Sequence, residues 1–237
     1  MHTFSGEAEI FVLVDFSIIH YGCWSGGTKY ENVKAHTILC KPISSKKKIV
    51  AGIEIRVPSK DVFKRFMNDF RSSKKVTGVL EVKALDRKGT FYRILFTETY
   101  DSMVASALSD YGSIFQENIV KNSVERVISI LPKSDVKNFR SELENIGKIT
   151  SFHALNVDLD SYLPSMLALS EREIMAISIA YSSGYYMFPK EATLQDIAKI
   201  MGISTSTTHE YLSKAEKKLV GKTLPIFSLA ASERQSI

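Results

Sequence analysis

The most regular pattern of apolar and polar positions lies in residues 193–220, where two short apolar stripes have the spacing of helices. The stripes consist of Leu194, Ile197, Ala198 and Met201, and then of Thr208, Leu212, Ala215 and Leu219. Thr193 and Asp196 form an expected capping box for the first helix, and Ser204 is an N-cap for the second. Gly202 lies between them, where a tight turn requires a positive φ. The pattern predicts a helix-turn-helix.

A further helix precedes this pair. Ser170 and Glu173 have the spacing of a second capping box, and Gly184 is placed to end the helix. Residues 185–191 contain Pro189, which prevents a continuous helix, so we expect an irregular connection there. We expect its aromatic side chains to hold the loop against the helices rather than to bind a ligand. These residues are Tyr185, Tyr186 and Phe188.

The first 160 residues contain a degenerate repeat, in which VPSKDV at residues 57–62 corresponds to LPKSDV at residues 131–136. In each copy the periodicity predicts a strand, then a helix with one apolar face, then another strand. The simplest arrangement is two consecutive βαββαβ units, residues 1–88 and 89–160, which resemble ferredoxin-like or ACT-like modules. The fit is poorest at residues 16–29, which have a weak helical pattern.

The predicted fold class is therefore α+β, with two tandem βαββαβ ferredoxin-like (ACT-like) modules followed by an all-α helix-turn-helix domain. We place this domain at residues 161–222 and a flexible tail, which contains Pro225, at residues 223–237. In such modules the helices cover one face of the sheet. The other face needs a partner, either the second module or a second chain.

The composition is that of an ordinary globular protein, with 44% hydrophobic and 24% charged residues. No apolar run approaches the ~20 residues of a membrane span. The first ten residues lack the basic and apolar regions of a secretory signal. Two cysteines, Cys23 and Cys40, are too few for a disulfide framework and fit a reducing compartment. We therefore expect a cytoplasmic protein without a membrane partner.

Four residues have the spacing of a mixed zinc site, namely His20, Cys23, His36 and Cys40. On a straight strand, however, His36 and Cys40 would lie ~13 Å apart, which is too far for one ion. We therefore expect packing residues and no metal or cofactor, with metal binding by these four residues as the alternative. The sequence contains no catalytic triad, dyad or cofactor motif, so we expect no enzyme.

Residues 169–220 resemble the C-terminal helix-turn-helix domain of archaeal bacterio-opsin-activator-type regulators. The shared motifs are S/T-x-R-E at residues 170–173, Gly-Tyr-Tyr-x-x-Pro at 184–189, Leu-x-x-Ile-Ala at 194–198, Gly-Ile-Ser at 202–204 and Ala-Glu-x-Lys-Leu at 215–219. Thr208 and Tyr211 depart from the pattern, because aliphatic residues are commoner there. The resemblance implies a transcription regulator. Together with the helix-turn-helix pattern it leads us to expect a protein that binds double-stranded DNA at a promoter, and we expect it to do so as a homodimer.

A recognition helix that enters the major groove presents its exposed face to the bases. We expect base contacts from Ser206, Thr207, Glu210 and Ser213, and phosphate contacts from Thr205, His209, Lys214, Lys217 and Lys218. Basic and acidic residues are equal in number over residues 170–220, so attraction to phosphates depends on how the charges are distributed. The net charge of the whole chain, +5, is compatible with an acidic partner.

Two alternatives stay open at this point. The N-terminal modules serve either as a dimerisation platform or also as a sensor of a small-molecule effector. A different class of function is a protein-interaction adaptor, in which the three helices bind a partner from the transcription machinery instead of DNA. Such an adaptor would show no salt-dependent retention on DNA.

Overall fold

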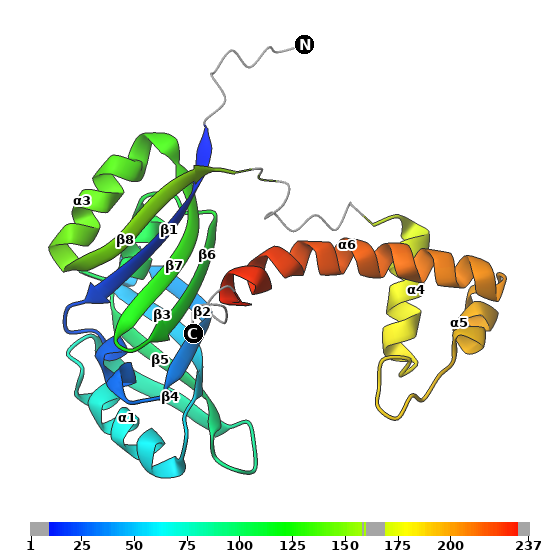
Figure 1. Cartoon of the computed structure of the whole chain (residues 1–237), viewed down its shortest axis with the longest axis horizontal. Coiled ribbons are helices and arrows are strands. Elements are labelled where there is room, and N and C mark those ends of the chain that lie inside the picture. Colours follow the sequence, from blue (N-terminus) through cyan, green and yellow to red (C-terminus); the bar gives the residue numbers. More distant parts are fainter. Residues whose placement is uncertain (1–9, 158, 160–168, 232–237) are drawn as a thin grey trace. The chain divides into compact units, whose positions relative to one another are not determined.

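The computed structural model describes residues 10–157, 159 and 169–231. They belong to two separate units, Met1–Val157 and Asp158–Ile237 (Figure 1). The strands of the first unit are β1 (Phe11–His20), β2 (Lys34–Ile43), β3 (Lys48–Arg56), β4 (Val76–Ala84), β5 (Phe91–Thr99), β6 (Phe115–Lys121), β7 (Val124–Pro132) and β8 (Gly147–Asn156). Its helices are α1 (Lys60–Ser72), α2 (Val104–Asp110) and α3 (Val136–Ile146), with short 3₁₀ turns η1 (Trp24–Lys29), η2 (Ser44–Lys46) and η3 (Lys133–Asp135).

The eight strands form one sheet in the order β4-β5-β3-β2-β6-β7-β1-β8, and neighbouring strands are antiparallel. Along the chain, the order strand, helix, strand, strand, helix, strand occurs twice, with η1 in place of the first helix. The poor helical pattern at residues 16–29 is explained by this 3₁₀ turn, since β1 continues to His20.

The strand order corrects the expectation of two consecutive modules. β5 follows residue 88 in sequence, yet it lies between β4 and β3 of the first half. β1 in turn lies between β7 and β8 of the second half. The two halves of the chain have therefore exchanged their first strands, and the halves form one continuous sheet. Alternation within a strand reports which face is buried but not which strand is its neighbour, so the sequence pattern could not reveal this exchange.

The hydrophobic side chains form two cores under the helices. Phe66 and Phe70 of α1 pack with Phe96 of β5, and the rings of Phe70 and Phe96 are 4.8 Å apart in an edge-to-face arrangement. In the second core Phe16 of β1 packs against Phe139 of α3, with ring centroids 5.6 Å apart. Figure 1 shows α1 and α3 over opposite ends of the sheet. The exchanged strands thus contribute to the core of the other half.

The second unit contains α4 (Glu171–Ser182), α5 (Leu194–Met201) and α6 (Thr205–Ala231). Its core is small and consists of Ala176, Ala180, Ile197, Met201 and Leu212, with partly buried apolar neighbours. Two alanines lie at the centre because small side chains allow the helices to approach closely. No helix in the described part of the chain is long and apolar enough to span a membrane.

The C-terminal tail differs from its prediction. The sequence predicts a flexible tail from residue 223, whereas α6 continues to Ala231 and contains Pro225. Leucine and alanine, which favour helices, are frequent after the proline, and the proline removes only one backbone donor. Residues 232–237 of the predicted tail lie outside the described residues.

Phe139 provides a test of the second core. Its side chain is fully buried against Phe16 and Tyr111. Phe139→Ala should therefore lower the free energy of unfolding by about 3–5 kcal/mol, because a cavity replaces the ring. Leu80→Ala removes a side chain that is 62% exposed and should change stability by about 0.5 kcal/mol or less. Urea unfolding followed by the fluorescence of Trp24, the single tryptophan, measures both. An equal decrease in the free energy of unfolding for the two variants would contradict the assignment of Phe139 to a buried core.

Candidate nucleic-acid interface

The corner between α5 and α6 has the geometry that the sequence predicts. Thr193 Oγ1 accepts a hydrogen bond from the backbone N–H of Asp196 at 3.3 Å, and the Asp196 carboxylate accepts one from the Thr193 N–H at 2.8 Å. Gly202 ends α5 with φ 65°, and no atom lies within 4 Å of the Cβ that another residue would carry. Glycine is therefore required by the backbone angle and not by crowding. The prediction of a helix-turn-helix is confirmed.

The start of α6 is fixed by hydroxyl groups. Ser204 Oγ accepts a hydrogen bond from the Thr207 N–H at 3.1 Å, as expected for an N-cap. The Thr207 hydroxyl lies 2.7 Å from the same Ser204 oxygen. Thr208 is fully buried, and its hydroxyl donates to the Ser204 carbonyl at 2.9 Å. This bond satisfies a polar group in a position where an aliphatic side chain is commoner, so the departure at Thr208 fits the corner.

The helix α6 has one buried face, toward the small core, and one face that is accessible to solvent. Thr208, Leu212 and Ala215 are buried. On the opposite side, the helical period places Ser206, Glu210, Ser213 and Lys217 in one row, and all four are exposed or half-exposed. His209 and Lys214 flank this row and are exposed, whereas Thr205 and Thr207 at the N-terminus are half-exposed. The structure therefore brings most of the expected contact residues together on one accessible face.

Lys218 is placed differently from the other lysines. Its Nζ lies 2.7 Å and 2.9 Å from the two carboxylate oxygens of Glu173, a residue that is 4% exposed. Glu173 also accepts the N–H of Ser170 at 2.7 Å in the capping box of α4. The pair connects α6 to the first turn of α4, and Lys218 lowers the pKa of Glu173. Sequence reasoning recognised Glu173 only as a capping residue, because nothing local indicates a partner 45 positions away.

The connection between α4 and α5 is held mainly by two tyrosines. Tyr185 packs on the core and lies under Lys190, whose Nζ is 4.0 Å from the ring centre. The Tyr186 hydroxyl donates to Glu216 of α6 at 2.6 Å. For these two residues the predicted packing role is confirmed. For Phe188 it is wrong, because that side chain is fully exposed.

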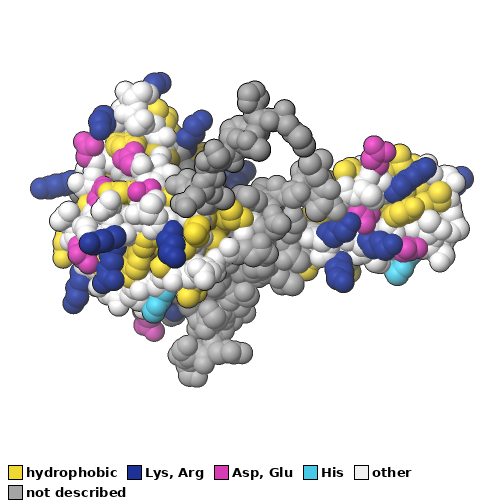
Figure 2. Space-filling model, turned by 90° about the horizontal axis from the view of Figure 1, so that it is seen from above, with side chains coloured by type: hydrophobic (Ala, Val, Ile, Leu, Met, Phe, Trp, Pro, Cys, Tyr) yellow, Lys and Arg dark blue, Asp and Glu magenta, His cyan; other side chains and the backbone are white. Residues whose placement is uncertain are grey.

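The charges of this unit are mixed rather than uniformly basic. Lys214 forms an ion pair with Glu210 one turn earlier, at 2.6 Å, as an exposed helix pair. Figure 2 shows lysine and arginine side chains next to acidic ones on the visible face of the C-terminal unit. Attraction to phosphates is therefore a property of a few positions and not of the unit as a whole.

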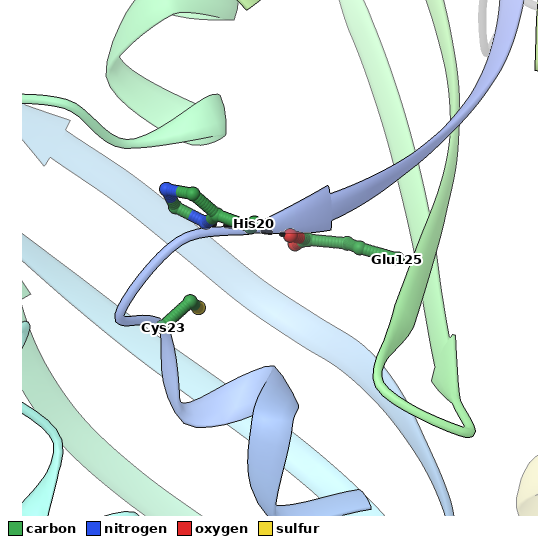
Figure 3. Close-up of side chains that lie close together, drawn as sticks. All are labelled: His20, Cys23 and Glu125. Atoms are coloured by element: carbon green, nitrogen blue, oxygen red, sulfur yellow. Dashed lines mark ion pairs between the residues drawn. The ribbon is translucent and has the colours of Figure 1, made fainter. Parts of the chain in front are cut away.

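The structure separates the four residues of the candidate zinc spacing. Among the described residues, His20 and Cys23 are buried next to Glu125, and the ligand atoms of these three lie within 4.8 Å of one another (Figure 3). His36 instead faces Glu117 at 3.5 Å with a half-exposed side chain. Cys40 lines a neighbouring cavity. The four residues of the alternative metal-site hypothesis are thus not one site. No spacing in the sequence indicated Glu125, which follows Cys23 by about a hundred residues.

Comparison with known families bears on the C-terminal unit. Residues 169–221 match the family model described as "HTH DNA binding domain". They form a helix-turn-helix DNA-binding domain. The same region is 42% identical over 53 residues to the bacterioopsin transcriptional activator of Halobacterium salinarum. The aligned region covers 22% of this chain and 8% of that protein.

Two further relatives match a larger part of the chain. The dimethyl sulfoxide reductase transcriptional activator of Halobacterium salinarum is 26% identical over 133 residues, covering 52% of this chain and 59% of that protein. The transcriptional regulator NarO of Haloferax volcanii is 24% identical over 148 residues, covering 58% and 69%. The matched region thus spans less than two thirds of the length of most of the curated relatives. No solved structure matches the chain significantly.

The turn at Gly202 can be tested with two substitutions. Gly202→Ala should destabilise the C-terminal unit by about 1–2 kcal/mol, because alanine resists the left-handed conformation. Gly202→Asn should cost less, since asparagine tolerates it. Denaturation followed by the helical circular dichroism signal measures these changes, and Trp24 fluorescence should report an unchanged N-terminal unit. An equal loss for both variants would show that the backbone angle is not the cause.

The ion pair between Lys218 and Glu173 should make stability depend on pH. Because the pKa of Glu173 is lowered in the folded state, the pair stabilises the fold above the ordinary glutamate pKa, and this contribution is lost as the pH falls through the lowered value. Lys218→Gln should therefore destabilise the C-terminal unit at neutral pH and less so in acid. Lys217→Gln removes the same charge from the exposed row and is the control. The same pH profile for both variants would contradict a structural role for Lys218.

Proposed function

We propose that the chain is a transcription regulator that binds double-stranded DNA in the cytoplasm as a homodimer. The observation that carries the proposal is the match of residues 169–221 to a DNA-binding helix-turn-helix, together with a corner whose caps and turn have the required geometry. The relatives, which are named as transcriptional activators or regulators, support the same class of function. A dimer would present two copies of α6, and their separation would match half-sites about one helical turn apart.

We assign the exposed row of α6 to the major groove. In this assignment Ser206, Thr207, Glu210 and Ser213 contact base edges, and Glu210 has the chemistry to accept a hydrogen bond from a cytosine amino group. Thr205, His209, Lys214 and Lys217 contact the phosphates. The ion pair of Lys214 with Glu210 is exposed, so phosphate can replace the carboxylate at little cost.

Lys218 has a different role in this assignment. Its partner Glu173 is buried and belongs to the capping box of α4, so release of Lys218 to a phosphate would leave a buried carboxylate uncompensated. We therefore assign Lys218 to holding α6 against α4, from where it supports the orientation of the recognition helix. Its positive charge still adds to the local field, although less than that of a free lysine.

The N-terminal unit is assigned to dimerisation and to sensing a small-molecule effector. Exposed apolar side chains on three strands favour contact with a second chain, since a sheet face of this kind needs a cover. They are Ile38, Leu39, Leu80, Val82 and Leu155. A groove of about 620 Å³ beside α3 and β8 has the size of a ligand site. Lys133, Lys137 and Arg140 line it, so an anionic effector fits best.

The DNA-binding assignment is tested by titration against salt. A DNA fragment is first selected from a random pool with the wild-type chain. Its binding by the wild-type chain and by the Lys214→Ala/Lys217→Ala variant is then compared in mobility-shift experiments at several salt concentrations. The double variant should bind more weakly, with a salt slope smaller by about 2, because about one counterion is released for each lysine–phosphate contact. Lys64→Ala/Lys83→Ala removes the same charge from the N-terminal unit and should keep the wild-type slope.

The alternative is the protein-interaction adaptor. It predicts that even the wild-type chain shows no salt-dependent binding to any fragment of the pool. Wild-type binding with an unchanged slope in the Lys214/Lys217 variant would keep DNA binding and overturn the assignment of these two lysines.

A further inference from the structure

A buried polar cluster adjoins the first hydrophobic core of the N-terminal unit, to which Cys23 belongs. His20 ends β1, Cys23 follows in the turn before η1, and Glu125 lies near the start of β7. Figure 3 shows the three side chains converging from these elements. All three residues are buried, and one ligand atom of each lies within 4.8 Å of the others. In a tetrahedral site with bonds of about 2.0–2.3 Å, ligand atoms lie about 3.3–3.8 Å apart, so a contraction of at most about 1.0–1.5 Å would bring them onto one ion.

The histidine is already oriented as a ligand. His20 Nε2 lies 2.9 Å from the carbonyl oxygen of Ser102, so this nitrogen carries the proton and donates it to the backbone. The other ring nitrogen, Nδ1, faces Glu125 at 3.7 Å and has no hydrogen-bond partner within the part of the chain that the structure describes. A backbone carbonyl that fixes the outer nitrogen while the inner one is free is the usual arrangement of a metal-binding histidine.

Two carboxyl groups around the cluster each have one oxygen without a hydrogen bond from the described residues. Glu125 accepts a hydrogen bond from the Asn118 amide on one oxygen, while its other oxygen, which faces His20 Nδ1, is buried and accepts no hydrogen bond from the described residues. The same holds for one oxygen of Glu98, which is 4% exposed. A buried polar group without a hydrogen bond is unfavourable, and more so when it is charged. A bound cation would satisfy the imidazole nitrogen and the carboxylate together.

There is room for a further ligand and a route for the ion. A cavity of about 20 Å³ adjoins the cluster and is lined by Cys23, Glu98 and Glu125, which is enough for one water. β2 and β6 are paired only from Lys34 to His36, and beyond this point a groove of about 260 Å³ opens between them. Asn118 and Cys40 line both the groove and the cavity.

We propose that His20, Cys23 and Glu125 bind a divalent transition-metal ion, for which Zn²⁺ is the best match, with a water in the adjoining cavity as fourth ligand. Imidazole, thiolate and carboxylate are the three side-chain ligands of zinc, and a set that includes both sulfur and nitrogen disfavours Mg²⁺ and Ca²⁺. The ion joins β1 to β7, and through His20 and Ser102 it also reaches the connection between β5 and α2. This site is independent of DNA binding.

A proton is the competing occupant. Burial lowers the pKa of His20, but the neighbouring Cys23 and Glu125 side chains raise it, and the net value is about 11. Without a metal the cluster would therefore hold a buried imidazolium beside the Glu125 carboxylate. Metal binding displaces this proton and that of the Cys23 thiol, whose pKa is raised by burial. The two occupants differ in one observable, a bond between the metal and sulfur.

Cobalt detects that bond. The full-length chain is treated with a chelator, dialysed and titrated with Co²⁺. We expect one equivalent to bind and to produce a thiolate-to-cobalt charge-transfer band, which one equivalent of Zn²⁺ then removes. Zn²⁺ should also raise the unfolding midpoint reported by Trp24, which adjoins Cys23.

The two cysteines make the test specific. Cys40→Ser leaves Cys23 as the single thiol, and we expect the band to persist in this matched control. Cys23→Ser should abolish the band, and His20→Gln should weaken Co²⁺ binding by about tenfold or more. If Cys23→Ser does not fold, the Cys40→Ser spectrum alone identifies the sulfur ligand. Absence of a band in the wild-type chain at excess Co²⁺, or its loss in Cys40→Ser, would overturn the proposal in favour of the protonated cluster.

Discussion

The exchange of β1 and β5 is the constraint on which the N-terminal unit depends. Each of these strands has its backbone groups bonded on both sides by strands from the other half of the chain. Removal of either strand would leave two neighbouring strands with unpaired donors and acceptors. Apart from the ladders of these exchanged strands, the halves are joined through β2 and β6, whose ladder contains only three residue pairs. The exchange, more than this ladder, makes the two halves one folding unit.

Local features were predictable from the sequence because they are set by neighbouring residues. The capping boxes, the left-handed Gly202 and the position of most strands and helices follow from periodicity and backbone preference. The exchange of strands and the pair of Lys218 with Glu173 were not predictable, since both join residues far apart in sequence. The same reason explains the cluster around Cys23: its spacing suggested His36 as a partner, whereas the fold supplies Glu125.

The DNA-binding unit shows how a domain without net charge can still present a recognition surface. Its core consists of little more than alanines and a few aliphatic side chains, so the positions of its helices depend on polar connections at the edges. Tyr186 with Glu216 and Lys218 with Glu173 connect α6 to the preceding segments from two sides. Neither pair involves a residue of the exposed row of α6, so in the proposed assignment this row remains accessible to DNA.

Burial of the polar cluster is unfavourable for folding, so a contribution to stability does not explain why these side chains are polar. Apolar side chains of similar size at buried polar positions such as His20, Glu98 and Glu125 are often neutral or stabilising. Burial, with Glu125 as the second cause, raises the pKa of Glu98 to about 8, which reflects the same cost. The cluster lies where β1 has crossed into the other half. An ion held there favours the exchanged sheet over any less complete arrangement by its binding free energy, so the ordering of the N-terminal unit becomes a function of metal supply.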